Sequence, residues 1–516
     1  MAPRTIPGLL AFGAETFGDH PAIVDGDVTI SYADLARRVN EASRGFLAAG
    51  VVPGDRVAIW APNRYEFIIA LLAAENIGAA MVPLNTRYRG QEARTILERS
   101  RAAVLVTSNG FLGADYVSML EESGEPLPSL KTVVNLGPTP HPHALDWDAF
   151  LAAGAAVTPE RLAEVQAEVT EETVADILFT SGTTGVPKGV MSAQRQTVGV
   201  ADVWARGATL TPADRYLVVN PLFHSFGYKA GVMAAFTAGS TVYLQATFDP
   251  VQAMEIIGRE HITVFPGAPT IFITLLNHER RSEFDLSSLR FSIAGAASVP
   301  ENLFQQMRDD LGIDQVAQAY GLTECVVATQ SRPHEDPLHI AETTGPAVPG
   351  LEIRTVGADG ADVAMGEDGE IWIRGDNVML GYFEDPKSTA ETIDAEGWLH
   401  TGDVGRLDEH GCLKITDRIK DMFTVGGFNV YPAEVENVIA SHPDVMETAV
   451  IGIDDERMGS VGRAYVVPRP GHEVSAEALT AYCRERLANF KVPRELVVLT
   501  EFPRNASGKI LKKDLA

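Results

Sequence analysis

Short apolar runs rich in β-branched residues alternate with helical patterns along most of the first 300 residues. Residues 56–60, 80–84 and 103–107 have the composition of buried strands, and residues 65–77 between the first two have a helical pattern. Similar strand-like runs follow at residues 176–179, 216–220, 241–244 and 263–265. A strand, a helix and a second strand form the unit from which parallel sheets are built. The alternation therefore predicts an α/β fold with a large N-terminal domain of stacked βαβ sheets.

The pattern changes near residue 350. Short strands separated by turns rich in Gly and Asp predict a small antiparallel or barrel-like subdomain over about 350–417, with strands at residues 352–356, 369–374 and 412–416. The last 100 residues or so have a mixed pattern of helices from Pro432 and over 475–488, and strands at 447–453 and 463–467. We therefore predict an N-terminal domain over 1–417, a hinge at 418–420 and a small, mobile α+β domain over 421–516.

The charge balance excludes several classes of partner. Lys and Arg number 42 and Asp and Glu 69, so the formal net charge is −27. A polyanion of this size is a poor partner for nucleic acid or an anionic membrane, so any phosphate-bearing ligand needs a local site. The apolar stretch at 67–84 contains Glu75 and Asn76, and we expect a buried helix leading into a strand there, without membrane insertion.

Cysteine usage and the N-terminus favour the cytoplasm. The chain has three cysteines and no CxxC pair, which argues against a disulfide scaffold or a zinc knuckle and fits a reducing compartment. The first apolar run is interrupted by Pro7 and Gly8, so it is a weak signal peptide at best. We expect a cytoplasmic protein. The sequence leaves the oligomeric state open, a homodimer included.

The strongest local motif is the segment FTSGTTGVPKGV at residues 179–190, directly after a predicted strand. Glycines let successive backbone N–H groups face an anion, hydroxyls add neutral donors, and Lys188 adds charge. The spacing differs from a Walker A loop, because two residues separate Gly182 from Gly185 and Lys188 precedes a glycine. The segment predicts a polyphosphate cradle formed by Thr180, Ser181, Gly182, Thr183, Thr184, Gly185 and Lys188.

This segment resembles the signature of the adenylate-forming superfamily, which contains acyl- and aryl-CoA ligases, adenylation domains and luciferases. Five further segments resemble family motifs in the expected order: YGLTE at 320–324, WLHTGD at 398–403, DRIKD at 417–421, GGFNVYPAEVE at 426–436 and PRNASGKI at 503–510. The resemblance covers essentially the whole chain. It implies a ligase that converts a carboxylate and ATP into acyl-AMP and pyrophosphate, and then transfers the acyl group to the thiol of coenzyme A.

The resemblance implies roles for single residues in nucleotide binding. Asp403 is expected to accept hydrogen bonds from the ribose hydroxyls, with help from Arg418. The ring of Tyr320 is expected to stack on adenine, and small residues are expected to form the opposite wall of that site: Gly295, Ala296 and Ala297. Gly321 is also expected to bind the nucleotide, and Gly295 and Gly321 are expected to contact the substrate as well. Thr323 is expected at the α-phosphate or the substrate carboxylate. Glu324, with Thr184, is expected to contact Mg²⁺, which prefers hard oxygen ligands.

The resemblance also implies two roles for the C-terminal domain. Lys509 is expected to neutralise charge between the carboxylate and the α-phosphate during adenylation. Gly426 and Gly427 are expected beside the CoA thiol in the second half-reaction. The two faces would alternate by rotation about a hinge at Lys420.

The acyl site is expected along the segment HSFGYKAG at residues 224–231. His224 matches a family position near the substrate carboxylate, Tyr228 is expected to line the pocket, and Lys229 is expected either to bind a polar group of the substrate or to extend to solvent. With the segments at 266–271 and 293–300, this run resembles CoA ligases of steroid catabolism that activate a bicyclic indane propanoate. Gly227 and Gly231 fit a pocket with room for a fused ring. A departure is His-Ser-Phe where His-Asn-Phe is expected.

Several alternatives remain at this stage. Medium- or long-chain fatty acids and aryl acids are other substrates for a ligase of this kind. An acyl-AMP ligase that loads a carrier protein is a second enzyme class, although no extra insertion after the nucleotide motifs is evident. A nucleotide-sensing protein without activity is a third class, and the joint presence of the nucleotide motifs and Lys509 argues against it.

Overall fold

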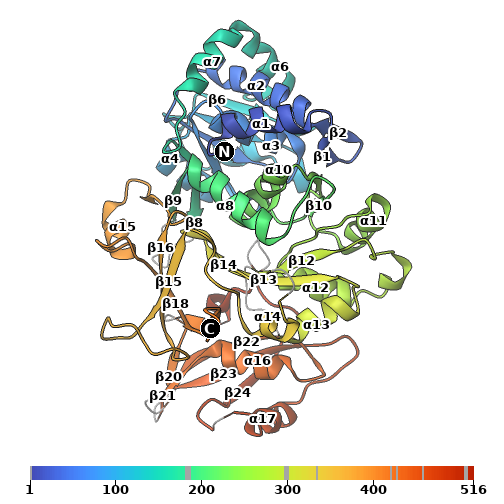
Figure 1. Ribbon diagram of the computed structural model, residues 1–516, viewed down its shortest axis with the longest axis vertical. Coiled ribbons are helices and arrows are strands. Elements are labelled where there is room, and N and C mark those ends of the chain that lie inside the picture. The colour runs from blue at the N-terminus through green and yellow to red at the C-terminus, as the bar shows by residue number, and fades with distance from the viewer. Residues whose placement is uncertain are drawn as a thin grey trace.

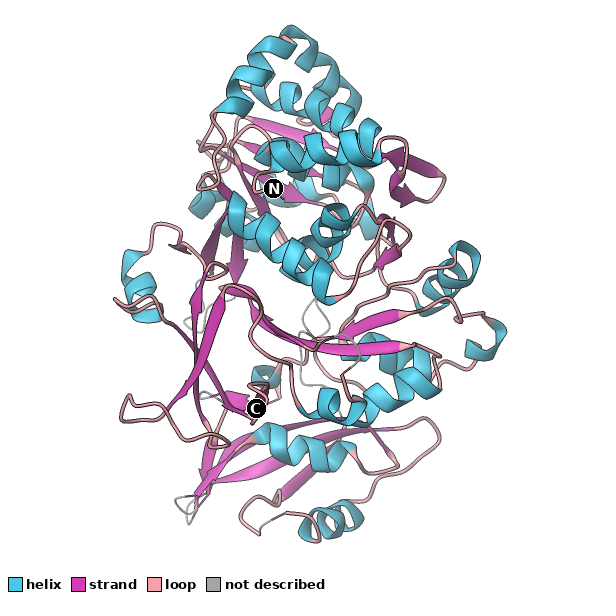
Figure 2. Ribbon diagram, in the orientation of Figure 1, coloured by secondary structure: helices cyan, strands magenta, loops and turns pink. Residues whose placement is uncertain are grey.

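The computed structural model describes residues 3–180, 187–295, 301–332, 335–418, 421–425, 428–455, 458–487, 489–504 and 509–515. Over these residues the strands form five sheets, joined and covered by helices (Figures 1 and 2). The largest sheet has eight strands, in the order β17 (Gly381–Tyr382), β9 (Lys188–Ala193), β8 (Val174–Thr180), β4 (Ala80–Pro83), β3 (Arg56–Trp60), β5 (Val104–Thr107), β6 (Thr132–Asn135) and β7 (Leu145–Asp146).

Both faces of this sheet are covered, which explains why its central strands are apolar throughout. Along β3, Val57 and Ile59 pack with one hydrophobic core, whereas Ala58 and Trp60 pack with another. The first core includes residues of α1 (Ile6–Phe17), α2 (Tyr32–Ala48), α3 (Tyr65–Glu75), α6 (Trp147–Ala153), α7 (Pro159–Ala167) and α8 (Gln194–Gly207). The second includes residues of α4 (Gly90–Ser100) and α5 (Tyr116–Glu122).

The strands β4, β3, β5, β6 and β7 are parallel to their neighbours, and β8 is parallel to β4. The other edge is different, because β9 runs antiparallel to β8 and β17 runs antiparallel to β9. The predicted phosphate loop connects β8 to β9. The strand β17 comes from a part of the chain almost 200 residues further on and completes this edge.

Two smaller sheets contain strands from residues 21–31 and 215–330 of the N-terminal region. One contains β10 (Arg215–Val218), β11 (Thr241–Leu244), β1 (Pro21–Asp25) and β2 (Val28–Ser31), and the other β12 (Phe291–Ala294), β13 (Gln315–Leu322) and β14 (Cys325–Gln330). Val264 links them through bridges to Tyr216 and Phe291. Their helices are α9 (Ser225–Gly227), α10 (Ala234–Ala238), α11 (Pro250–Glu260), α12 (Pro269–Leu276), α13 (Glu301–Asp309) and α14 (Pro337–Glu342), with a π-helical turn η3 (Tyr228–Met233) between α9 and α10.

The last two sheets are mainly antiparallel. The first contains β15 (Leu351–Val356), β16 (Gly369–Gly375), β18 (Leu399–Leu407) and β19 (Leu413–Arg418), and α15 (Pro386–Thr392) lies between β17 and β18 in sequence. The second contains β21 (Phe428–Val430), β20 (Phe423–Val425), β23 (Gly459–Pro468), β22 (Val445–Asp455) and β24 (Glu495–Val498), with α16 (Pro432–Ala440) and α17 (Ala476–Arg484). Figure 1 places this C-terminal sheet at the bottom of the view, and α16 contacts β19.

The α/β architecture confirms the predicted fold class, with three differences in the strands and helices predicted from sequence. Residues 263–265 form only bridges through Val264 and no strand of their own. The helix predicted over 65–77 ends at Glu75, and the one predicted over 475–488 ends at Arg484. The predicted subdomain near 350–417 is a four-stranded antiparallel sheet. The chain passes from β19 of this sheet to β20 of the C-terminal sheet across residues 419–422, and the domain boundary there stays a prediction.

The apolar stretch at 67–84 forms the buried helix α3 and the strand β4, as expected. Its polar residues Glu75 and Asn76 are fully buried and hydrogen-bonded inside the protein. Among the helices in the described ranges, none has the length and apolarity that a membrane span requires.

Candidate active site

The hairpin of β8 and β9 carries the predicted phosphate loop. Thr180 at the end of β8 pairs with Lys188 at the start of β9, and the Thr180 hydroxyl donates to the Lys188 carbonyl at 3.4 Å. Both side chains are half-buried. The loop residues between them lie outside the described residues: Ser181, Gly182, Thr183, Thr184 and Gly185. Their roles stay predictions.

Lys188 and Glu324 meet at a tyrosine that no motif indicated. The Lys188 ammonium lies 4.9 Å from the ring centroid of Tyr382, close enough for a cation–π interaction. The Tyr382 hydroxyl donates to Glu324 Oε1 at 2.7 Å. The phosphate-loop lysine and the predicted Mg²⁺ ligand therefore share one buried aromatic neighbour, although they are far apart in sequence.

The predicted ribose site is built from β13 and β18. Tyr320, on β13, donates its hydroxyl hydrogen to Asp403 Oδ2, on β18, at 2.6 Å, and both side chains are buried. This bond fixes the orientation of the Asp403 carboxylate. Arg418 is paired with Asp403 in the register of β18 and β19, and its side chain lies outside the described residues. The stacking of the Tyr320 ring on adenine stays a prediction.

The small residues predicted to line the nucleotide site follow β12 or lie near the end of β13. Gly295 follows β12 and lies near the backbone of Ala319, the residue before Tyr320. Ala296 and Ala297 lie outside the described residues. Gly321 is the second-last residue of β13, just before the turn to β14, and an added Cβ there would lie 2.0 Å from the Val326 carbonyl oxygen, so only glycine fits. Thr323 and Glu324 are half-buried in this turn.

His224 and Lys509 are close enough to influence each other electrostatically. His224 caps the N-terminus of α9, where its Nδ1 accepts a hydrogen bond from the Phe226 N–H at 3.2 Å. Burial of the ring and the positive charge of Lys509 lower the pKa of His224 to about 4. The imidazole is therefore neutral at physiological pH. Of the C-terminal lysine motif, Lys509 therefore lies near the predicted acyl loop in this structure.

Tyr228 and Lys229 belong to a buried polar network. Lys229 Nζ lies 3.0 Å from Asp176 Oδ2 and donates to Ser192 Oγ at 2.7 Å, and its side chain is 1% exposed. Tyr228 donates to Glu75 Oε1 at 2.5 Å. The expected extension of Lys229 to solvent is wrong, because Asp176 at the base of β8 holds its ammonium inside the protein. A contact of either residue with substrate stays a prediction.

Two buried carboxylate oxygens of this polar network lack a hydrogen-bond donor among the described residues. They are Glu75 Oε2 and Asp176 Oδ1. Burial and the nearby charge of Asp176 raise the pKa of Glu75 well above its usual value. The carboxylate that pairs with the Lys229 ammonium is therefore that of Asp176, while Glu75 accepts from the Tyr228 hydroxyl.

Gly227 and Gly231 serve close packing. A Cβ on Gly227 would lie 2.4 Å from the carbonyl oxygens of Asn220 and Pro221. A Cβ on Gly231 would lie 3.3 Å from the Phe226 carbonyl oxygen and 3.6 Å from Val218. The space beside both glycines is taken by the chain itself, so they do not supply the room for a fused ring that the sequence suggested.

Two C-terminal predictions lie outside the described residues. Lys420 precedes β20, and Gly426 and Gly427 connect β20 to β21, which pair antiparallel from Phe423 with Val430 to Val425 with Phe428. The hinge and thiol-site roles of these residues stay predictions.

Comparison with known proteins gives the family. The model of the AMP-binding enzyme family matches residues 10–383, and that of its C-terminal domain matches residues 434–509. The chain belongs to the AMP-binding enzyme family. It is therefore an acyl- or aryl-CoA ligase of the adenylate-forming type, an AMP-forming acid–thiol ligase. Enzymes of this kind use a carboxylic acid, ATP and coenzyme A.

Relatives of this AMP-binding enzyme are similar over their full length. A protein of Rhodococcus jostii (strain RHA1) named 3-[(3aS,4S,7aS)-7a-methyl-1,5-dioxo-octahydro-1H-inden-4-yl]propanoyl:CoA ligase is 48% identical, covering 99% of this chain and 98% of its own. A protein of the same name from Mycobacterium tuberculosis (strain ATCC 25618 / H37Rv) is 46% identical, with the same coverage. The crystal structure of the anthranilate CoA ligase AuaEII in complex with anthranoyl-AMP is 26% identical, with a TM-score of 0.90 over 99% of this chain and 96% of its own.

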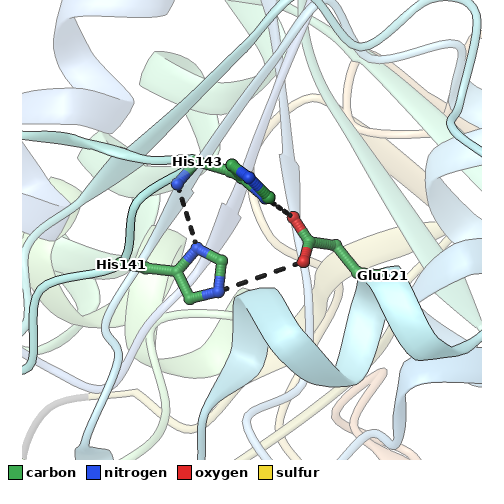
Figure 3. A group of neighbouring side chains, drawn as sticks. All are labelled: Glu121, His141 and His143. Atoms are coloured by element: carbon green, nitrogen blue, oxygen red, sulfur yellow. Dashed lines mark hydrogen bonds and ion pairs between the residues drawn. The ribbon is translucent and has the colours of Figure 1, made fainter.

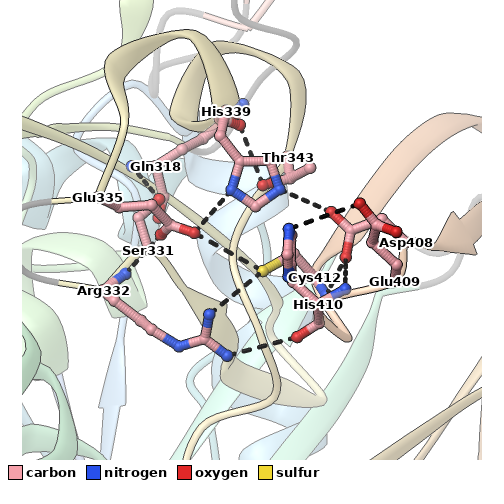
Figure 4. Close-up of polar contacts among 10 residues, drawn as sticks. All are labelled: Gln318, Ser331, Arg332, Glu335, His339, Thr343, Asp408, Glu409, His410 and Cys412. Carbon is pink, nitrogen blue, oxygen red and sulfur yellow. Dashed lines mark hydrogen bonds and ion pairs between the residues drawn. The ribbon is translucent and has the colours of Figure 1, made fainter.

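Two further clusters of ionisable side chains in this AMP-binding enzyme lie away from the nucleotide motifs. On the surface, His143 Nδ1 lies 2.7 Å from Glu121 Oε1, and His141 Nε2 lies 4.0 Å from Glu121 Oε2 (Figure 3). In the second cluster, His339 lies between two carboxylates, with Nδ1 2.7 Å from Glu335 and Nε2 2.6 Å from Asp408 (Figure 4). Hydrogen bonds with Asp408 and Glu335 raise the pKa of His339, and hydrogen bonds with His339 and two backbone N–H groups lower the pKa of Asp408. The second cluster joins α14 to the turn between β18 and β19.

Sequence analysis missed Tyr382, Glu75 and Asp176. Each makes its contact with a residue at least 50 positions away, and none stands in a motif. Glu75 carried a signal, because a carboxylate inside an otherwise apolar helix needs a buried partner. Tyr382 follows a glycine in a two-residue strand, which no periodicity reveals.

Proposed function

We propose that this enzyme is an ATP-dependent CoA ligase for a bicyclic, keto-substituted indane propanoate of steroid origin. One observation carries the proposal: two bacterial relatives with that substrate in their names are 48% and 46% identical to the chain along its whole length. The resemblance of the acyl-loop segments at 224–231, 266–271 and 293–300 to this group of ligases supports the same substrate.

In the proposed first half-reaction, a carboxylate oxygen attacks the α-phosphorus of ATP, and pyrophosphate leaves with its bonding electrons. Both reactants are anions, so positioning and charge neutralisation are the main tasks of the protein. Lys188 and the backbone of its loop are proposed to bind the polyphosphate. Lys509 is proposed to stabilise the charge that develops between carboxylate and α-phosphate. Burial and the charge of Lys509 lower the pKa of His224 in the acyl loop, so the two side chains are near each other.

The donor set fits a magnesium ion at Glu324. One carboxylate oxygen accepts the Tyr382 hydroxyl hydrogen, which leaves the second oxygen as a hard ligand in a half-buried position. Mg²⁺, when bound, would neutralise part of the polyphosphate charge. Tyr320 and Asp403 are proposed to hold the nucleoside, with the carboxylate accepting from the ribose hydroxyls.

In the proposed second half-reaction, the CoA thiol loses its proton and attacks the acyl carbon, and AMP leaves with the electrons of the mixed anhydride. His224, the first residue of the acyl loop, is neutral, and because its Nδ1 accepts the Phe226 N–H, its Nε2–H is proposed to donate a hydrogen bond at the acyl group. The C-terminal domain over 421–516 is proposed to rotate about Lys420, so that Gly426 and Gly427 replace Lys509 at the site. The cytoplasm supplies ATP and CoA and is the proposed location.

An acid panel tests the substrate. Pyrophosphate release is measured with the indane propanoate, the same acid with both ketones reduced, palmitate and ferulate. We expect kcat/KM for the diketone to exceed that for palmitate about 100-fold or more. A pocket that hydrogen-bonds polar groups of its substrate discriminates strongly against an acid without them, because its own polar groups are then left unpaired. Formation of acyl-CoA with free CoA separates this function from an acyl-AMP ligase that loads a carrier protein. Strong activity with palmitate and none with the diketone would overturn the proposed substrate.

A further inference from the structure

The backbone and the ring of Tyr382 are both held in place at the edge of the eight-stranded sheet. Its backbone pairs with Val190 of β9, and its N–H donates to Thr389 Oγ1 at 2.9 Å. Its ring is 7% exposed and packs with Val190 and Met379. Gly381 before it has a φ of 135°, and a Cβ there would lie 2.8 Å from Thr389. The side chain therefore has little freedom to move.

Tyr382 contacts both charged groups of the phosphate site with different parts of its ring. The hydroxyl donates to Glu324 Oε1 at 2.7 Å, and the face of the ring is 4.9 Å from the Lys188 ammonium. Tyr382 and Glu324 are also tied through the backbone, because the Met379 N–H donates to the Glu324 carbonyl at 2.8 Å. The pair is thus held by a segment that belongs to neither motif.

Opposite charges in a half-buried site attract each other strongly when no ligand is bound. If Lys188 and Glu324 paired directly, each would lose the charge that it offers to the polyphosphate or the metal. No such ion pair forms within the part of the chain that the structure describes. Tyr382 gives the ammonium an aromatic face and the carboxylate a hydroxyl donor, so both charges have a partner and neither is neutralised.

We propose that Tyr382 is a positioning residue that keeps Lys188 and Glu324 apart and aligned for a nucleotide polyphosphate with its divalent cation. This role rests on the proposed function in one respect, the binding of metal and ATP at this site. It does not depend on which carboxylic acid the enzyme activates.

Tyr382→Phe removes only the hydroxyl, and the test measures metal binding directly. Mn²⁺ is titrated by electron paramagnetic resonance in the presence of α,β-methylene-ATP, which does not transfer AMP because a methylene group replaces the oxygen between its α- and β-phosphorus atoms. We expect Tyr382→Phe to weaken Mn²⁺ binding about 10-fold, because a hydrogen bond that orients a charged ligand is lost. Affinity for the nucleotide in EDTA should change less than about 2-fold, because the ring beside Lys188 remains. Excess Mg²⁺ should restore adenylation.

Tyr382→Leu removes the ring as well. We expect it to weaken nucleotide binding in EDTA about 5-fold beyond Tyr382→Phe, because Lys188 loses its aromatic neighbour and is free to pair with Glu324. Tyr116→Phe is the matched control: its hydroxyl is buried and donates to the Thr86 carbonyl at 2.9 Å, away from the motifs. That variant should bind Mn²⁺ and nucleotide like the wild type.

Unchanged Mn²⁺ binding by Tyr382→Phe, with its thermal unfolding midpoint equal to that of the wild type, would overturn the positioning role. Equal nucleotide affinities of Tyr382→Phe and Tyr382→Leu would also overturn it. The proposed substrate fails separately, if the wild type binds metal and nucleotide and does not activate the indane acid. Wild-type protein that binds no Mn²⁺ with the nucleotide would refute both proposals.

Discussion

Lys509 is the residue whose removal should separate the two half-reactions. Lys509→Ala should lower the rate of acyl-AMP formation about 100-fold or more, because it removes an electrostatic stabiliser of the transition state. Acyl-CoA formation from supplied acyl-AMP should change much less. Pyrophosphate release and acyl-CoA formation are measured separately, with Lys512→Ala as the control. An equal loss in both half-reactions contradicts the assignment.

The charge of the same lysine contributes, after burial, to the low pKa of His224. Burial and the charge of Lys509 lower the pKa of His224 to about 4, so the wild-type ring should not titrate between pH 5 and 8. Lys509→Gln removes the charge and should raise the pKa of His224. NMR spectra of protein labelled at histidine measure both values, and His224→Gln assigns the signal. Titration of the wild-type His224 ring near pH 6.5 would contradict the expected low pKa.

At the scale of elements, the buried Lys229–Asp176 pair joins the strand before the phosphate loop to the π-helical turn after His224. Lys229→Met should lower the free energy of unfolding by about 3–5 kcal/mol, because it leaves a buried carboxylate without its cation. Lys229→Met/Asp176→Asn should be more stable than the single variant. Thermal unfolding midpoints compare the variants. A double variant less stable than Lys229→Met contradicts the pairing.

The double variant also decides the role of Lys229 in the acyl site. The double variant removes both charges of the pair. If the Lys229 ammonium is purely structural, the KM of this variant for the acid should stay within about 2-fold of the wild type. A large rise in KM together with recovered stability would show that Lys229 contacts the substrate.

The contact of α14 with the β18–β19 turn should depend on pH. The pKa of His339 is raised from 6.5, so its stabilisation is full below pH 6.5 and is lost as the pH rises through the raised value. The pKa of Asp408 is lowered from 3.8, so its stabilisation is full above pH 3.8 and is lost as the pH falls through the lowered value. Together they stabilise this contact most between about pH 4 and 6.5.

His339→Gln should therefore lower the unfolding midpoint most at pH 5–6 and little at pH 9. The control His143→Gln removes a histidine that is 69% exposed beside Glu121, and it should have almost no effect at either pH. A pH-independent loss in His339→Gln would contradict the ionic nature of this contact.

The elements predicted from sequence differ from those observed mainly where long-range contacts decide. The apolar runs of β3, β4 and β5 were predictable because a strand buried on both faces must be apolar throughout. Residues 263–265 have the same composition, but only Val264 forms bridges there. The partners of Lys229 and Tyr382 were unpredictable for a related reason, since no local pattern indicates which distant carboxylate a buried cation or hydroxyl contacts. The motif residues Tyr320 and Asp403, by contrast, are hydrogen-bonded to each other, and their roles in nucleotide binding stay predictions.

At the scale of the whole molecule, the hinge prediction is the one with the largest consequence. Lys420→Pro fixes φ at one position and should block rotation of the C-terminal domain. Because the charge of Lys509 lies close enough to lower the pKa of His224 in this structure, we expect the blocked enzyme to retain adenylation and to lose most acyl-CoA formation. Rapid-quench measurement of each half-reaction tests this. Lys420→Ala is the control, because it removes the same charge and leaves φ free. Equal behaviour of the two variants contradicts the hinge.

The edge strand β17 has a consequence for synthesis of the chain on the ribosome. The strand β9 is complete once Ala193 has been translated, but its neighbour β17 at Gly381–Tyr382 follows about 190 residues later. At about 5–20 residues per second, the backbone edge of β9 stays uncovered for roughly 10–40 s in each nascent chain. An exposed sheet edge is a template for pairing with another chain. Fragments that end before residue 381 should therefore aggregate, and slow translation of this stretch should lower the yield of folded enzyme.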